Sequence, residues 1–285
     1  MRRHACLSAL AGFASLAAIA AASPALAGSV SFVSSKGVDN GNCGLAASPC
    51  RTFAYALTQT NASGEIKVLD PGFYNTVAIN KSVTITGVPG TSIAMTAPNT
   101  AITIDAGANG IVNLRGIEIN GQGVGLAGIS VLSAKAVNIV DCIVRRVGAD
   151  GISISPNSGA VSATISNTIS SNNGNFGMQF VPGFGASVKA SIDHSTMNDN
   201  GFAGVMGSDG AALMITDSNA DNNAIDGFRA AGGATSLMWL GRNVATGNSV
   251  GIKNVTSASV RSFGDNKVIG NATNTSGAIV TVAHK

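Results

Sequence analysis

The chain has 285 residues, of which only 11% are charged and 5% aromatic, whereas 36 are glycine. This length corresponds to about two average domains, although repeat folds often exceed that rule as a single domain. The composition excludes a charge-rich disordered chain, a coiled coil and a basic nucleic-acid-binding domain. The abundance of Gly, Asn, Ser and Thr also disfavours long helices.

Residues 1–27 have the layout of a secretory signal peptide. Arg2 and Arg3 precede a small apolar stretch from Ala5 to Ala22, and the segment closes with the small-residue sequence SPALA at positions 23–27. A positive start, an apolar middle and a small-residue exit define such leaders. An uncleaved membrane anchor is the alternative, which the Ala-rich middle and the cleavage site disfavour. We therefore expect a secreted or periplasmic protein whose mature chain begins at residue 28.

The mature chain is close to neutral. Cleavage removes two of the 17 basic residues and leaves the 14 acidic ones unchanged. Charge therefore supports neither a nucleic-acid partner nor an anionic membrane partner. Beyond the leader, no apolar run is long enough to span a bilayer, so we expect no membrane span after signal cleavage.

Three cysteines follow the leader. Cys43 and Cys50 are separated by six residues, a spacing that in an exported chain predicts a small disulfide loop. No further Cys or His lies nearby to complete a metal site with them. Cys142 lies in a strand-like run, so we expect a buried, inert thiol there.

Residues 28–64 are predicted to form an N-terminal unit made of a strand, the disulfide loop and a short capping helix. Ser48 is expected as the helix N-cap with Pro49 at the first helical position, and the helix is expected over 51–60. Phe53, Ala56 and Leu57 would lie on one face and cover the first turn of the following domain. Residues 254–285 keep a β character and are expected to close the other end.

A repeat dominates residues 65–285. Each copy has an apolar residue, Asn eight positions later, and then Gly followed by a bulky apolar residue. The marker glycines are separated by 23, 26, 27, 23 and 24 residues, and they are Gly128, Gly151, Gly177, Gly204, Gly227 and Gly251. This period with short alternating strands excludes the longer helical repeats. The scarcity of Leu excludes a leucine-rich repeat.

Strands this short bury enough surface only if the chain coils and each strand pairs with its equivalent one turn away. The residues after the marker glycines then form an apolar inward column: Ile129, Ile152, Met178, Val205, Phe228 and Ile252. The repeated Asn residues form a second column, expected at tight corners with left-handed backbone and stacked amides: Asn173, Asn200, Asn223, Asn248 and Asn271. The predicted fold is all-β, a single-stranded right-handed parallel β-helix.

The repeats and the opening segment resemble the pectate-lyase-like β-helix superfamily, in particular its exported right-handed β-helix repeat proteins. The opening stretches that carry the resemblance are 32–53, 64–74 and 79–85. The resemblance covers nearly all of the mature chain and implies the fold, with the activity left open. Members of this superfamily that are enzymes act on a sugar polymer that lies across the outside of the helix.

One polar column emerges when the repeats are aligned by their first apolar residue. Its members are Asp141, Asn167, His194, Asp217 and Arg242, with Asp193 beside His194. The column follows an inward apolar position by two residues, so it faces water only if each strand ends there in a corner. Five stacked positions about 4.8 Å apart would span roughly 19 Å, enough for several sugar units. We call these six residues the corner strip.

Two interpretations of the corner strip stay open. It is either a glycan-contact strip or a solvated corner whose Asp and Asn residues serve turn geometry. The polygalacturonase motifs that the resemblance would supply are absent apart from a chance-level N-x-D, so no catalytic residue is assigned. No metal site is predicted and no cofactor is expected. Calcium, which lyases of this superfamily often use, has no motif in this chain.

Two functions from different classes follow. The first is an exported β-helix protein that binds a polysaccharide or cell-surface glycan without catalysis. The alternative is a polysaccharide lyase, hydrolase or epimerase that acts on an acidic glycan. Smooth, short-looped repeats and the presence of only two glutamates favour the first function. The sequence does not fix the oligomeric state.

Overall fold

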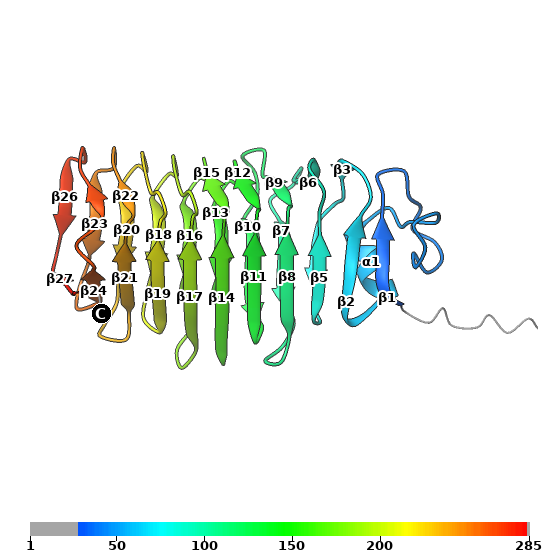
Figure 1. Cartoon of the computed structure of the whole chain (residues 1–285), viewed down its shortest axis with the longest axis horizontal. Coiled ribbons are helices and arrows are strands. Elements are labelled where there is room, and N and C mark those ends of the chain that lie inside the picture. Colours follow the sequence, from blue (N-terminus) through cyan, green and yellow to red (C-terminus); the bar gives the residue numbers. More distant parts are fainter. Residues whose placement is uncertain (1–27, 284–285) are drawn as a thin grey trace, which may run out of the picture.

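The computed structural model describes residues 28–283, and the predicted leader lies outside the described residues. The chain coils into a long parallel β-solenoid with three sheets along its sides (Figure 1). Sheet A contains, in spatial order, β1 (Gly28–Val33), β2 (Thr60–Val68), β5 (Val83–Thr86), β8 (Ile111–Arg115), β11 (Ala136–Val140), β14 (Ala160–Ser166), β17 (Ser187–Asp193), β19 (Ala211–Thr216), β21 (Leu237–Gly241), β24 (Ser259–Ser262) and β27 (Ile279–Thr281).

The other two sides are shorter. Sheet C contains β4 (Val77–Ile79), β7 (Thr100–Asp105), β10 (Ala127–Ser133), β13 (Asp150–Ile154), β16 (Phe176–Phe180), β18 (Ala203–Gly207), β20 (Asp226–Ala230), β23 (Val250–Asn254) and β26 (Thr273–Ser276). Sheet B contains β3 (Gly72–Phe73), β6 (Thr91–Ala94), β9 (Glu118–Asn120), β12 (Ile143–Arg145) and β15 (Ile169–Ser171), followed by the pair β22 (Val244–Ala245) and β25 (Lys267–Val268). The predicted all-β parallel solenoid is thus confirmed.

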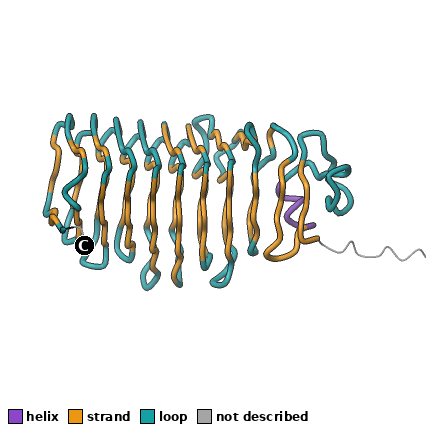
Figure 2. Tube along the Cα trace, in the orientation of Figure 1, coloured by secondary structure: helices purple, strands orange, loops and turns teal. Residues whose placement is uncertain are grey.

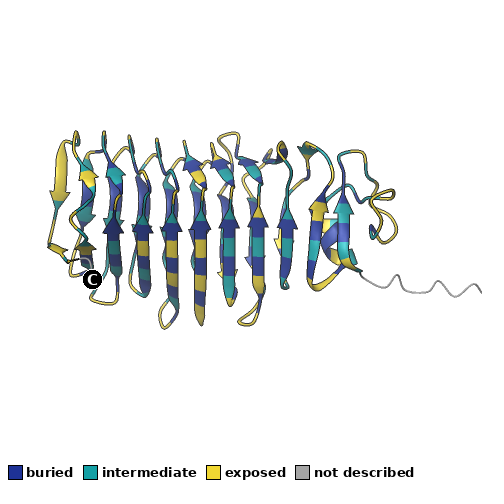
Figure 3. Ribbon diagram, viewed as in Figure 1, coloured by how far each residue is buried: buried dark blue, intermediate teal, exposed yellow. Residues whose placement is uncertain are grey.

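Each turn runs from sheet A through a corner to sheet B, and from there through a second corner to sheet C. Side chains along sheet A alternate between buried and more exposed positions (Figure 3). The predicted inward column of sheet C is confirmed. Its register pairs Ile152 with Met178, Met178 with Val205 and Val205 with Phe228, and all four are 0–1% exposed. Stacking of equivalent residues therefore builds one continuous apolar core.

The second corner contains the predicted ladder of buried asparagine amides. The Nδ2 of Asn200 donates to Oδ1 of Asn223 at 2.9 Å, and Nδ2 of Asn223 donates to Oδ1 of Asn248 at 3.1 Å. The expectation that these residues have left-handed backbone is wrong, because the positive φ belongs to the preceding residue, such as Asn222. The physical reason is that the side-chain amide of each asparagine must point inward to reach the asparagine of the next turn. The preceding residue therefore adopts the left-handed backbone that makes the turn.

The N-terminal end of the core is covered by helix α1 (Phe53–Gln59), which lies against the first turns (Figure 2). Phe53, Ala56 and Leu57 are buried as predicted. The predicted helix start is wrong, because the N-cap is Thr52, whose hydroxyl accepts a hydrogen bond from the Tyr55 amide.

Cys50 explains the late start of α1. The Cys43–Cys50 disulfide is present, with the two Cα atoms 5.2 Å apart. Cys50 also donates its amide to the carbonyl of Phe32 and accepts from the amide of Ser34. A residue held in this extended bridge cannot join a helix, so Ser48 and Pro49 remain in the loop before it.

Residues 254–283 continue the solenoid in register. β24 pairs with β27 and β23 pairs with β26, both in parallel. β26 and β27 are the terminal strands of sheets C and A, and Ile279 packs against the core, whereas Ile269 is 69% exposed and Val280 is 56% exposed. The segment therefore forms the last turn of the solenoid. Across the described part of the chain, no helix is long and apolar enough to cross a membrane.

Candidate functional site

The corner strip lies where sheet A ends and the chain turns toward sheet B. Asp141, Asn167, His194, Asp217 and Arg242 all have φ between 46° and 55°. The left-handed backbone ends the strand at each position, so that the side chain of the corner residue itself leaves the alternation and points outward. The predicted corner is therefore confirmed, and it carries these polar side chains outward without burying them.

The strip is in register from turn to turn. The residues just before it are paired across sheet A: Ser166 with Asp193, Asp193 with Thr216, and Thr216 with Gly241. The corner amides extend the same ladder, since the His194 amide donates to the Thr216 carbonyl at 3.3 Å. Stacking at one residue per turn thus follows from the backbone and does not depend on the side chains.

Ion pairs divide the strip into two parts. At one end, Nη2 of Arg115 lies 2.9 Å from Oδ2 of Asp141. At the other end, Arg242 donates from Nε to Oδ1 of Asp217 at 2.7 Å and from Nη2 to Oδ2 at 2.6 Å. Asn167 lies on the turn between the two parts. The structure therefore brings Asp193, His194, Asp217 and Arg242 together and leaves Asp141 in a separate pair.

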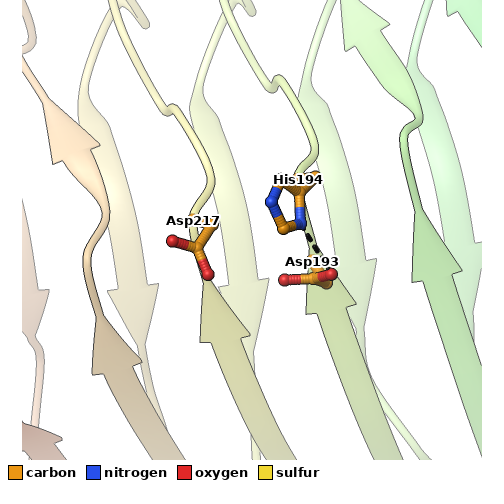
Figure 4. A group of neighbouring side chains, drawn as sticks. All are labelled: Asp193, His194 and Asp217. Atoms are coloured by element: carbon orange, nitrogen blue, oxygen red, sulfur yellow. Dashed lines mark hydrogen bonds and ion pairs between the residues drawn. The ribbon is translucent and has the colours of Figure 1, made fainter.

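Asp193, His194 and Asp217 form the centre of the larger part (Figure 4). Nδ1 of His194 lies 2.7 Å from Oδ2 of Asp193, and the hydroxyl of Thr216 donates to Oδ1 of Asp193 at 2.9 Å. One ligand-type atom from each of the three residues lies within 4.8 Å of the other two. The carboxylate of Asp193 is thus fixed from two sides and in turn orients the imidazole.

Electrostatics in this part favour the charged forms of His194, Asp217 and Arg242. The hydrogen bond to Asp193 raises the pKa of His194, and the Asp193 charge adds to this. The guanidinium of Arg242 lowers the pKa of Asp217. The same hydrogen bond to Asp217 raises the pKa of Arg242. Arg242 therefore remains a permanent cation and cannot act as a proton acceptor.

A shallow groove on the outer face of sheet A adjoins the strip. Its lining includes Thr164, Lys189, Ser191, Met214, Leu237 and Trp239. Met214 and Trp239 are paired in the register of β19 and β21, and Thr216 and Gly241 follow them at the strand ends. Trp239 is partly exposed, and it is the only tryptophan of the chain. The groove therefore offers an aromatic surface three residues before the corner residue Arg242.

Trp239 was not predicted as a site residue, although the alternation of inward and outward side chains in this strand indicates that it points outward. Leu240 is the first apolar residue of a repeat copy and is fully buried, so its neighbour Trp239 must point outward. Cys142 behaves as predicted, since it is buried as a free thiol and burial raises its pKa to about 11. It therefore takes no part in the site.

The comparisons with known proteins concern the fold. The family model described as "Right handed beta helix region" matches residues 100–283. A crystal structure of pectate lyase Pel9A has a TM-score of 0.57 and 17% sequence identity, over 89% of this chain and 77% of that chain. A structure titled rhamnogalacturonan lyase has a TM-score of 0.53 and 13% identity, over 90% of this chain and 87% of that chain.

No curated protein sequence matches the chain significantly. At the identities of the two solved structures, the likeness shows a common fold only. The family model spans more than half of the chain, including every member of the corner strip. The chain belongs to the right-handed β-helix family.

Proposed function

We propose that this protein is an exported glycan-binding β-helix that holds a polysaccharide or cell-surface glycan without catalysis. The observation that carries the proposal is the position of Trp239 and its groove on β17, β19 and β21, the three strands that lead into the corner with Asp193, His194, Asp217 and Arg242. An aromatic face packs against the apolar face of a sugar ring, and neighbouring polar groups bind its hydroxyls.

The spacing of the solenoid suits a polymer. Equivalent positions on successive turns lie about 4.8 Å apart, so a sugar chain that runs along the solenoid axis meets a similar set of groups at each step. The turns at the corner fix the backbone that carries the strip. Binding therefore costs little conformational entropy in the backbone. The fold shared with a pectate lyase and a rhamnogalacturonan lyase supports a glycan as the ligand class.

The ion pairs favour binding over the alternative of an acidic-glycan lyase or hydrolase. A lyase needs a basic group that accepts a proton, and Arg242 is locked in its charged form by Asp217. The same guanidinium is already bound to the carboxylate of Asp217 through Nε and Nη2, so the carboxylate of a uronic acid would compete with Asp217 for these donors. One observation supports the alternative: Asp193 orients His194 through Nδ1, as in carboxylate–histidine pairs that serve as general bases.

The test uses the single tryptophan as a probe. Purified protein is titrated with a panel of neutral and acidic polysaccharides, and tryptophan fluorescence reports binding. The absorbance of unsaturated products is followed in the same samples. We expect a saturable fluorescence change with at least one glycan and no product absorbance. Product formation that His194→Ala abolishes would establish the lyase alternative.

Two variants locate the site on the glycan that gives the signal, with binding measured by calorimetry. Trp239→Ala and the combined Asp193→Ala, His194→Ala, Asp217→Ala and Arg242→Ala variant should each weaken binding by about tenfold or more. The matched control is Phe184→Ala, because Phe184 is a fully exposed aromatic residue in the loop before β17, at the other end of that strand. Equal binding by parent and both site variants would refute this location.

Export is tested separately. The Cys43–Cys50 disulfide is compatible with an oxidising compartment. We expect the cell-surface, periplasmic or secreted fraction to contain a chain that begins at Gly28, which N-terminal sequencing of that fraction detects.

A further inference from the structure

Asp193, His194 and Asp217 present one imidazole and two carboxylates on adjacent turns. Oδ2 of Asp193 and Nδ1 of His194 are 2.7 Å apart, and a carboxylate oxygen of Asp217 completes a group whose atoms lie within 4.8 Å of one another. Donors in a tetrahedral zinc site lie about 3.4 Å apart, so the side chain of Asp217 would have to move by up to about 1.4 Å, which a side-chain rotation provides. The backbone thus already places three ligands around one point.

Two carboxylates lie at this point, those of Asp193 and Asp217. The guanidinium of Arg242 supplies a positive charge and is bound to Asp217. Asp193 is paired with the ring of His194, so a cation that takes the place of the proton between them keeps this carboxylate paired.

The ligand orientation is supported from outside the group. The hydroxyl of Thr216 holds the second oxygen of Asp193, an arrangement typical of the hydrogen-bonded carboxylates around metal sites. His194 is exposed and Asp217 is half-buried, so water or a ligand hydroxyl can reach the remaining coordination positions. Such a site would be open on one side.

We propose that Asp193, His194 and Asp217 bind a divalent first-row transition-metal ion such as Zn²⁺, in competition with the guanidinium of Arg242. An imidazole ligand suits Zn²⁺ and its neighbours in the series, whereas Ca²⁺ takes six to eight oxygen ligands. The ion replaces the proton shared by Asp193 and His194. Arg242 repels the ion and occupies both oxygens of Asp217, so it limits the affinity.

Because Arg242 competes with the ion, the proposal predicts that some substitutions weaken Zn²⁺ binding and that one strengthens it. Untagged, metal-free protein is titrated with ZnCl₂ by calorimetry at neutral pH. His194→Gln and Asp217→Asn should each weaken binding by about tenfold or more. Arg242→Met should strengthen it by about threefold or more, because a positive charge and a competing partner are both removed. If Arg242 served only to stabilise the fold, its replacement would not increase the affinity for Zn²⁺.

Controls separate this site from adventitious binding. His284→Gln removes the other histidine that follows the leader and should leave Zn²⁺ binding unchanged, and CaCl₂ should bind far more weakly than ZnCl₂. Thermal melts confirm that each variant is folded. Should a variant fail to fold, the imidazole signals of His194 in the parent protein give the answer, since they must shift on addition of Zn²⁺.

Three results would overturn the proposal: no Zn²⁺ binding by the parent, binding that His194→Gln leaves unaltered, or weaker binding by Arg242→Met. Each of these measurements is independent of any glycan. The metal site can therefore fail while the proposed glycan binding stands, and the reverse also holds.

Discussion

The buried hydroxyl of Tyr74 donates a hydrogen bond to the carboxylate of Asp70, four residues earlier in the chain. The same carboxylate accepts from the hydroxyl of Ser34 and from the amide of Ser35, each at 2.7 Å. Asp70 therefore ties the end of β1 to the first turn of the solenoid. These hydrogen bonds lower the pKa of Asp70 to about 2.

This network makes stability depend on acid pH. Because the folded-state pKa of Asp70 is lower than its ordinary value of 3.8, its stabilising contribution is present above about pH 4 and disappears as the pH falls toward 2. After allowance for solvent screening, we expect this contribution to be roughly 1 kcal/mol. The free energy of unfolding, measured between pH 2 and 5, should fall less steeply for Asp70→Asn than for the parent. Identical slopes would show that Asp70 is not the responsible group.

The inward column predicts a large penalty for a charge in the core. Val205 is fully buried between Met178 and Phe228 of the neighbouring turns. Val205→Asp should reduce the free energy of unfolding by about 3 kcal/mol or more, because the carboxylate would be buried without a partner. Met206→Asp is the matched control, since Met206 is the next residue and is partly exposed. Denaturant unfolding of the two variants distinguishes inward from outward positions.

The asparagine ladder should be a second determinant of stability. Oδ1 of Asn200 accepts from the amide and from Nδ2 of Asn173, and its own Nδ2 donates to Asn223. Asn200→Ala leaves the buried amide of Asn173 without its acceptor and removes one of the two donors to Oδ1 of Asn223, which should cost about 2–4 kcal/mol. Asn99→Ala, at an exposed loop position, should change stability very little. Equal melting temperatures for the two variants would contradict a structural role for the ladder.

The disulfide should stabilise the N-terminal cap. Cys43 and Cys50 close a short loop, which contributes about 2–3 kcal/mol in the loop-entropy model. The double variant Cys43→Ala and Cys50→Ala should lose about this much stability, with its unfolding measured in the absence of reductant. Mass spectrometry of the exported protein should find both thiols oxidised, and two free thiols there would contradict the assignment.

The repeat by itself determined most of the architecture. Its spacing and the apolar residues after the marker glycines predicted parallel coiling and the inward column, because a solenoid buries the same position on every turn. It also predicted that Asp141, Asn167, His194, Asp217 and Arg242 share one corner, since burial of all five would cost too much. Local period and polarity are sufficient for such conclusions, because every turn repeats the same environment.

Only the tertiary structure decided how these residues pair. Contacts between neighbouring turns depend on side-chain lengths and directions, so the bidentate Arg242–Asp217 pair, the separate Arg115–Asp141 pair and the Asp193–His194 contact were not predictable from the strip alone. The start of α1 at Phe53 was decided by the bridge that Cys50 makes with β1. Trp239 became part of the site because strand pairing placed it beside Met214, one turn away. A one-dimensional repeat fixes which residues stack, whereas the partner that each side chain finds depends on the three-dimensional positions of its neighbours.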